Sequence, residues 1–128
     1  MKVICEFSNG QNLSEEYWEI GFSKKTIFDV NIGSEYLVYG ISLWRKQFFY
    51  LICDEYNLPN WYPAEIFKVV DNRISKNWKF KLSEFYDEYS VEALIGYPEL
   101  IDIENHYAEL IERDSEALKI FANLMVEN

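Results

Sequence analysis

The sequence predicts an α+β fold, in which a small, strongly bent antiparallel β-sheet or barrel is followed by C-terminal α-helices. The first observation is a series of short apolar runs with the composition and spacing of strands over about residues 1–82. The second is a change to helical spacing of the apolar residues after residue 101. The third is size, because 128 residues, 49% of them hydrophobic, suffice for a single domain (1–128) with its own core.

Six segments are expected to be strands because apolar and polar residues alternate in them, or because they are rich in β-branched and aromatic residues. They are residues 3–7, 28–32, 36–44, 48–53, 66–71 and 77–82. Residues 28–53 together predict a three-stranded antiparallel meander, and residues 54–63 are expected to form a loop. In the last strand, Trp78, Phe80 and Leu82 should face one way and the intervening lysines the other.

Helices are expected near the start and at the end of the chain. Residues 13–20 have the spacing of a helical turn, and residues 83–97 are compatible with a third C-terminal helix or an ordered loop. Two amphipathic helices should occupy 102–113, with Asp102 as N-cap, and 114–127, capped by Asp114 or Ser115. Their apolar stripes should pack on the sheet. These stripes are Ile103, Tyr107, Leu110 and Ile111 in the first helix, and Ala117, Leu118, Phe121, Leu124 and Met125 in the second.

Negative charge is concentrated in the last third of the chain. There are 22 acidic and 12 basic residues, which gives a net charge of −10. Residues 1–83 hold ten of each, so residues 84–128 hold the remaining twelve acids and only two bases, Arg113 and Lys119. A field of this sign repels nucleic acid and attracts basic partners. The alternative is that an acidic region only keeps the protein soluble.

The two cysteines and the N-terminus indicate a cytoplasmic protein. Cys5 and Cys53 match neither a disulfide framework nor a zinc-binding spacing, which predicts buried thiols in a reducing compartment. Glu6 interrupts the first apolar run, so no signal peptide is expected, and no uncharged stretch reaches the length of a membrane span. No cofactor or metal site is expected.

Catalytic and nucleic-acid-binding functions find little support. The single histidine, His106, is expected at a helix surface or boundary, without a nucleophile or metal partner. Asp54 and Glu55, at a strand end beside aromatic residues, would suit a carboxylate-based hydrolase, but adjacent strand residues point to opposite faces. Lysines near Trp78 and Phe80 would suit base stacking, but the overall charge opposes it.

Binding to another protein is the function that remains, although an aromatic residue in a small barrel more often belongs to the core than to an interface. Twenty-three aromatic residues (ten Tyr, nine Phe, four Trp) exceed what a small core needs, and interfaces favour Tyr and Trp. Two acidic sites are candidates. One comprises Glu84, Asp87, Glu88 and Glu92, and the other comprises Asp54, Glu55, Trp61 and Tyr62. Of the adjacent rings Trp61 and Tyr62, one is expected in the core and the other at the surface, because a strand alternates its faces.

Two stretches resemble parts of a Src-homology-3-like barrel. "VNIGSEYLVYGI" has a strand, a glycine-containing turn and a second strand, and "WYPAEIFKVVD" resembles the segment that precedes the last strand of such barrels. The acidic specificity loop and paired tryptophans of the peptide-binding family have no clear counterpart here. A stand-alone protein- or peptide-binding module is the alternative that this resemblance implies.

The whole chain also resembles small bacterial immunity proteins of contact-dependent and other polymorphic toxin systems. The resemblance rests on "WYPAEIFKVVD" (61–71), Trp78, "GYPEL" (96–100) and "ERDSEALKIF" (112–121). It implies a cytoplasmic protein that binds a toxin domain and blocks its active site. Toxins of this kind are often basic nucleases, so the expected partner is a basic protein toxin domain. No set of functional residues is carried over from the resemblance.

Overall fold

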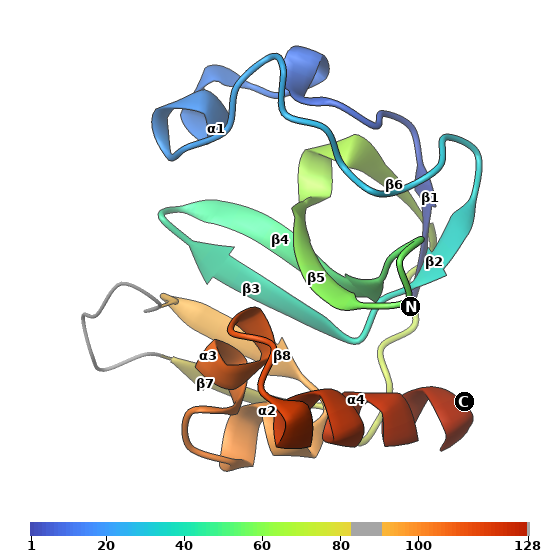
Figure 1. The fold of residues 1–128 in the computed structure, drawn as a ribbon, viewed down its shortest axis with the longest axis vertical. Coiled ribbons are helices and arrows are strands. Elements are labelled where there is room, and N and C mark those ends of the chain that lie inside the picture. The colour runs from blue at the N-terminus through green and yellow to red at the C-terminus, as the bar shows by residue number, and fades with distance from the viewer. Residues whose placement is uncertain (83–90, 128) are drawn as a thin grey trace.

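The computed structural model describes residues 1–82 and 91–127, and its strands form two antiparallel sheets (Figure 1). The three-stranded sheet has the order β2 (Glu35–Leu37), β1 (Lys2–Cys5), β6 (Phe67–Asp71). The five-stranded sheet has the order β5 (Pro59–Pro63), β4 (Gln47–Cys53), β3 (Gly40–Trp44), β8 (Ala93–Gly96), β7 (Lys79–Leu82). The strands lie mostly in the first part of the chain and the helices mostly in the last, so the predicted α+β class is confirmed.

The helices are short except for the last one. They are α1 (Glu15–Glu19), α2 (Pro98–Asp102), α3 (His106–Ile111) and α4 (Ser115–Glu127), with 3₁₀ turns at Gly10–Asn12 and Ala64–Ile66. Figure 1 shows α2, α3 and α4 grouped on the side of the molecule away from α1. None of the helices in the described part of the chain has the length and apolar character needed to cross a membrane.

The starts of α2 and α4 follow from their sequences. Pro98 is the first residue of α2, where its fixed φ suits a helix and its missing N–H costs nothing. Asp114 caps α4, because its Oδ2 accepts the N–H groups of Glu116 at 3.1 Å and Ala117 at 3.2 Å. The predicted cap at 114 is therefore confirmed, whereas Asp102 ends α2 instead of starting a helix.

A two-residue turn sets the register of β3 and β4. Arg45 and Lys46 both have positive φ values, 47° and 68°, which is the backbone of a turn whose twist matches that of a hairpin. The turn pairs Trp44 with Gln47 and, four residues farther along each strand, Gly40 with Leu51. Both carboxylate oxygens of Glu92 accept the Lys46 N–H, at 3.1 and 3.0 Å, and so hold this turn against the segment before β8.

The predicted meander is wrong in two respects. Residues 28–32 form no strand, although Phe28 and Val30 are buried at 5% and 4% exposure while Ile32 is 65% exposed. The predicted strand 36–44 is divided into β2 and β3, which belong to different sheets. The chain passes between the sheets just before Gly40, where an added Cβ would lie 2.9 Å from a methyl carbon of Leu100. Close packing against α2 therefore favours glycine at this crossing.

Two other expectations need correction. Residues 59–63, expected to be a loop, form β5, whose prolines are tolerated because β5 is an edge strand. Strand β8 likewise lies within 83–97, where a helix or loop was expected. The strand at 79–82 is correct, but it is the opposite edge strand, and Phe80 and Leu82 are 59% and 66% exposed instead of buried.

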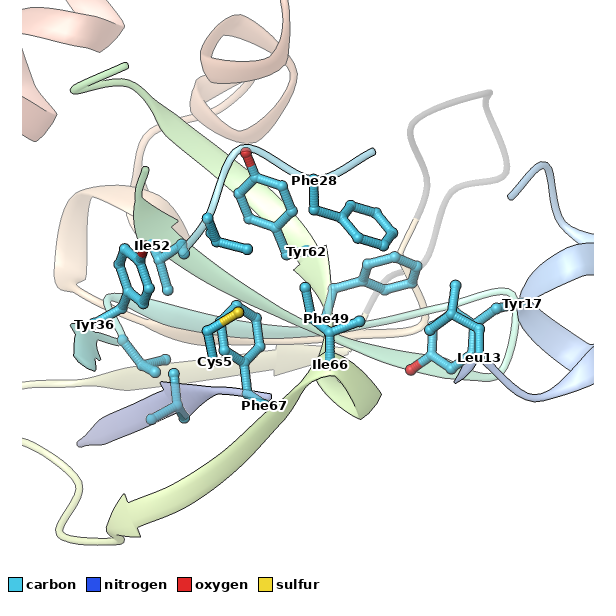
Figure 2. Close-up of a cluster of buried hydrophobic side chains, with 13 residues drawn as sticks. Cys5, Leu13, Tyr17, Phe28, Tyr36, Phe49, Ile52, Tyr62, Ile66 and Phe67 are labelled. Atoms are coloured by element: carbon cyan, nitrogen blue, oxygen red, sulfur yellow. The ribbon is translucent and has the colours of Figure 1, made fainter. Parts of the chain in front are cut away.

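The interior consists of two hydrophobic clusters. The first lies between the two sheets and under α1, and Figure 2 shows its aromatic rings converging from strands and loops. Its members include Cys5, Leu13, Tyr17, Phe28, Tyr36, Phe49, Ile52, Tyr62, Ile66 and Phe67. The second lies between the five-stranded sheet and α2–α4, as predicted for the C-terminal helices, and includes Tyr39, Leu51, Leu94, Tyr97, Leu100, Leu110 and Phe121. Trp44 and Trp61 pack against both clusters.

Candidate functional site

Tyr62 and Asp54, two of the candidate binding residues, form a buried pair. Asp54 is 6% exposed, and its carboxylate accepts hydrogen bonds from the Tyr62 hydroxyl (2.6 Å), the Asn60 side-chain amide (2.6 Å), and the N–H groups of Tyr56 (3.0 Å) and Leu58 (3.3 Å). Burial, and then the bond to Asp54, raise the pKa of Tyr62, so its hydroxyl stays protonated and donates. The pair organises the β4–β5 turn and offers no free group to a partner.

The two remaining predicted acids that the structure describes, Glu55 and Glu92, lie apart. Glu55 is exposed and accepts the Tyr36 hydroxyl at 2.6 Å, just after the C-terminal end of β4. Glu92 is exposed and bound to the β3–β4 turn, at the opposite end of β4. Glu84, Asp87 and Glu88 lie outside the residues that the structure describes.

Trp61 lies on the opposite face of β5 from Tyr62 and borders a cavity of about 330 Å³. The cavity, which we call the Trp61 groove, lies between β4–β5 and α3 and is lined mainly by Phe22, Phe49, Trp61, Tyr107, Leu110 and Ile111. The ring centroids of Trp61 and Tyr107 are 5.4 Å apart. The indole Nε1 of Trp61 is buried and has no hydrogen-bond partner among the described residues. The groove therefore offers a largely apolar surface.

Arg113 fixes the wall of the groove. Its guanidinium donates to the Pro59 carbonyl and, at 2.7 Å, to Oδ1 of Asn60, and thus ties the residue after α3 to β5. Arg113 has a φ of 62°, a left-handed conformation that turns the chain from α3 toward α4. Arg113 is an isolated base among acids, and this was the one indication in the sequence of its role. Nothing in the sequence indicated that Phe22 and Tyr107 line the same cavity.

The surface of the helical part carries unneutralised negative charge. We call the exposed carboxylates of this part the helical acidic surface; they are Asp102, Glu104, Glu112, Asp114, Glu116 and Glu127. Within the described residues, one of them forms an ion pair, Asp102 with Lys79 at 2.7 Å. Glu104 and Glu112 lie near the two ends of α3, the helix that lines the Trp61 groove.

His106 is fully buried, at 0% exposure, which corrects the expectation of a surface or boundary position. Its Nε2 lies 2.7 Å from the hydroxyl of Tyr97. Burial raises the pKa of Tyr97 and lowers that of His106, with Glu99 opposing the second effect, so the hydroxyl donates to a neutral imidazole. His106 therefore acts as a packed residue of α3 that holds Tyr97.

The described residues give little support to hydrolytic or metal chemistry. The Asp54 carboxylate accepts four hydrogen bonds from neighbouring residues. Of the two carboxylates considered for a hydrolase, only that of Glu55 is therefore exposed. Across residues 1–82 and 91–127, no group of three or more His, Cys, Asp or Glu side chains is placed to hold a metal ion. Cys5 is a buried free thiol and Cys53 a partly buried one.

No family model, curated protein or solved structure matches this chain. The candidate site is therefore defined by geometry and charge: the apolar Trp61 groove with the helical acidic surface beside it.

Proposed function

We propose that this protein is an immunity-type inhibitor that binds a basic toxin domain through the helical acidic surface and the Trp61 groove. The proposal rests on the carboxylates of the helical part, most of which form no ion pair with a basic side chain within the described residues. Only Asp102 of its carboxylates has an ion-pair partner within the described residues, and Arg113 is turned inward to β5. A basic partner would supply the missing positive charge.

The two parts of the site have different roles. Exposed carboxylates such as Glu104, Glu112 and Glu116 would steer a basic domain to the surface and raise the association rate at low ionic strength. The Trp61 groove would then hold one apolar side chain of the partner and slow dissociation, since buried aromatic anchors carry most of the energy of an interface. Inhibition would follow because acidic side chains compete for the positive groups with which a nuclease binds phosphate. This role places the protein in the cytoplasm, where such a toxin acts.

The test is co-expression with the toxin domain encoded directly upstream, followed by measurement of the complex. We expect protected cells and a complex whose association rate falls steeply with salt. Replacement of Glu104, Glu112 and Glu116 by Gln should lower that rate about tenfold at low salt. The matched control replaces Glu15, Glu16 and Glu19 by Gln, on α1 at the far side of the molecule, and should leave the rate unchanged. Cell death together with no complex at low salt would overturn the proposal.

A stand-alone peptide-binding module is the second candidate, and the apolar lining of the Trp61 groove favours it. Such a module would take an apolar side chain of an uncharged peptide against the rings of Trp61 and Tyr107. The two candidates differ in salt dependence. Binding that is unchanged between low and high salt, and unaffected by the triple Gln substitution on the helices, would favour the peptide module over the toxin inhibitor.

A further inference from the structure

A second cavity, of about 450 Å³, lies where the three-stranded sheet meets the helical part. Its walls come from segments distant in sequence: the end of β2, the chain before β7, the start of α2 and the end of α4. Unlike the Trp61 groove, it combines aromatic and polar side chains. We call it the Glu99 cavity, and the residues that matter to its chemistry are Tyr39, Asn77, Trp78, Tyr97, Glu99 and Glu127.

Three aromatic side chains form the apolar part of the Glu99 cavity. Tyr39 and Tyr97 are 9% and 4% exposed, and each packs against Phe121, with ring centroids 4.8 and 6.4 Å from it. Trp78 is partly buried and belongs to the other side of the cavity, where it packs against the first cluster. Rings held in place by such packing present fixed π-surfaces, which attract cations.

The polar part of the cavity is negative. Oε2 of Glu99 is buried and has no hydrogen-bond partner among the described residues, and Glu127, at the end of α4, is exposed. A buried carboxylate oxygen is costly unless a donor or a positive charge reaches it. The groups around Glu99 do not supply that charge, since His106 is held neutral and accepts from Tyr97.

The nearby lysine side chains have other partners. Lys79 pairs with Asp102, and the Lys81 ammonium is 3.5 Å from the carbonyl of Ile101. The α-amino group of Met1, another residue of the cavity wall, acts on Asp71, whose pKa is lowered first by Arg73 and to a smaller extent by this terminus. Within the described residues, no lysine or arginine side chain forms an ion pair with Glu99.

We propose that the Glu99 cavity is a socket for one cationic side chain, a lysine or arginine of the basic partner. Glu99 would accept the hydrogen bonds of the ammonium or guanidinium group, the rings of Tyr39, Trp78 and Tyr97 would surround its alkyl stem and charge, and Glu127 would attract it at the mouth. Uncharged apolar ligands would instead prefer the Trp61 groove. The identity of the partner rests on the proposed function, but the chemistry of the socket does not.

The experiment uses the whole protein and small probes, so that it does not depend on the toxin. The indole ¹⁵N–H resonance of Trp78, assigned with Trp78→Phe, is followed during titration with N-acetyl-lysine methylamide and N-acetyl-arginine methylamide. The neutral N-acetyl-citrulline methylamide has nearly the shape of the arginine probe and serves as its control. We expect saturable shifts with both cations and little or none with citrulline.

Two variants test the carboxylates. Glu99→Gln should weaken cation binding about tenfold or more, because it removes a buried charge with little change of shape. Glu127→Gln, at an exposed position, should weaken it by a smaller factor, and Glu16→Gln on α1 should have no effect. Equal shifts with citrulline and arginine, or wild-type affinity in both the Glu99 and Glu127 variants, would overturn the socket.

The outcomes also separate this inference from the proposed function. If the probes bind but co-expression gives neither protection nor a complex, the socket stands and the toxin-inhibitor role falls. If protection is found and the probes fail to bind, the role stands and the socket falls.

Discussion

The hydroxyl of Tyr62 donates to Oδ2 of Asp54 across 2.6 Å in the interior of the protein, and this bond ties a ring of the first cluster to the turn between β4 and β5. Tyr62 is 6% exposed, and its ring meets that of Phe28 edge-on at 5.8 Å, while Trp61 on the other face borders the groove. The segment 54–63, which was expected to be a loop, thus contributes one ring to the core and another to the wall of the Trp61 groove.

Removal of this bond should destabilise the fold. Tyr62→Phe leaves a buried carboxylate oxygen with one donor fewer, which should lower the free energy of unfolding by about 1.5–3 kcal/mol. Asp54→Ala removes all four bonds of the carboxylate and should cost more. Urea unfolding measures both effects, with Tyr56→Phe at a ring that is 71% exposed as control. A Tyr62→Phe variant as stable as the wild type would show that the bond does not contribute.

His106 should make stability depend on pH. Burial lowers the pKa of His106 below that of the unfolded chain, near 6.5, so the unfolded state binds more protons below that pH. The contribution is fully present above about pH 6.5 and is lost as the pH falls toward the folded-state pKa, by at most about 1.4 kcal/mol per pH unit. Urea unfolding at pH 7.5 and 5.5 should therefore show a larger loss for wild type than for His106→Gln. Equal losses would mean that His106 can be protonated without unfolding.

The N-cap of α4 should make a measurable contribution to the free energy of unfolding. Asp114→Ala removes the acceptor for two N–H groups at the start of the helix and should lower the free energy of unfolding by about 0.5–2 kcal/mol. Asp114→Ser retains an acceptor and should recover most of this loss, which separates capping from the general effect of a changed charge. Chemical unfolding of the two variants gives the comparison, and equal destabilisation by Ala and Ser would contradict the capping role.

Substitution of Trp61 should weaken partner binding more than it lowers the stability of the fold. If the toxin-inhibitor proposal holds, Trp61→Ala should weaken the complex by about 2 kcal/mol or more, mainly through faster dissociation. Trp61→Phe keeps the packing against both clusters and should lose less. Ile27→Ala, at a residue that is 73% exposed near α1, is the surface control. Surface plasmon resonance provides the rates; an unchanged dissociation rate in both Trp61 variants would remove the groove from the interface.

The sequence predicted most elements where local pattern and burial agree. Strand β4 and helix α4 were found because a dense apolar run and an amphipathic period, with Asp114 at the cap, are determined locally. Strand β5 was missed because two prolines argue for a loop unless the strand is known to lie at an edge. The alternation of apolar and polar residues in β7 identified a strand. Which face of this strand is covered by other parts of the protein depends on segments distant in the sequence.

The site was harder to predict than the fold. Periodicity placed Ile103 and Ile111 on the buried stripe of a helix, yet they are 39% and 41% exposed, while His106 and Leu110 face the interior. The position of the helix was shifted because α2 ends at Asp102 and α3 begins anew at His106. Asp54 could not be recognised as an internal acceptor, since two of its donors come from the turn that it organises and the other two from the next strand, β5.

Trp44 and Trp61 each contact both hydrophobic clusters, and this sharing has a consequence for how the protein loses its structure. Neither cluster can open without exposing indole surface that the other also buries, so the β-rich and helical parts should melt in one cooperative transition. The same coupling connects recognition with stability. A partner side chain that fills the Trp61 groove would add contacts at the seam between the two clusters, and the bound protein would resist heat and proteolysis as a whole.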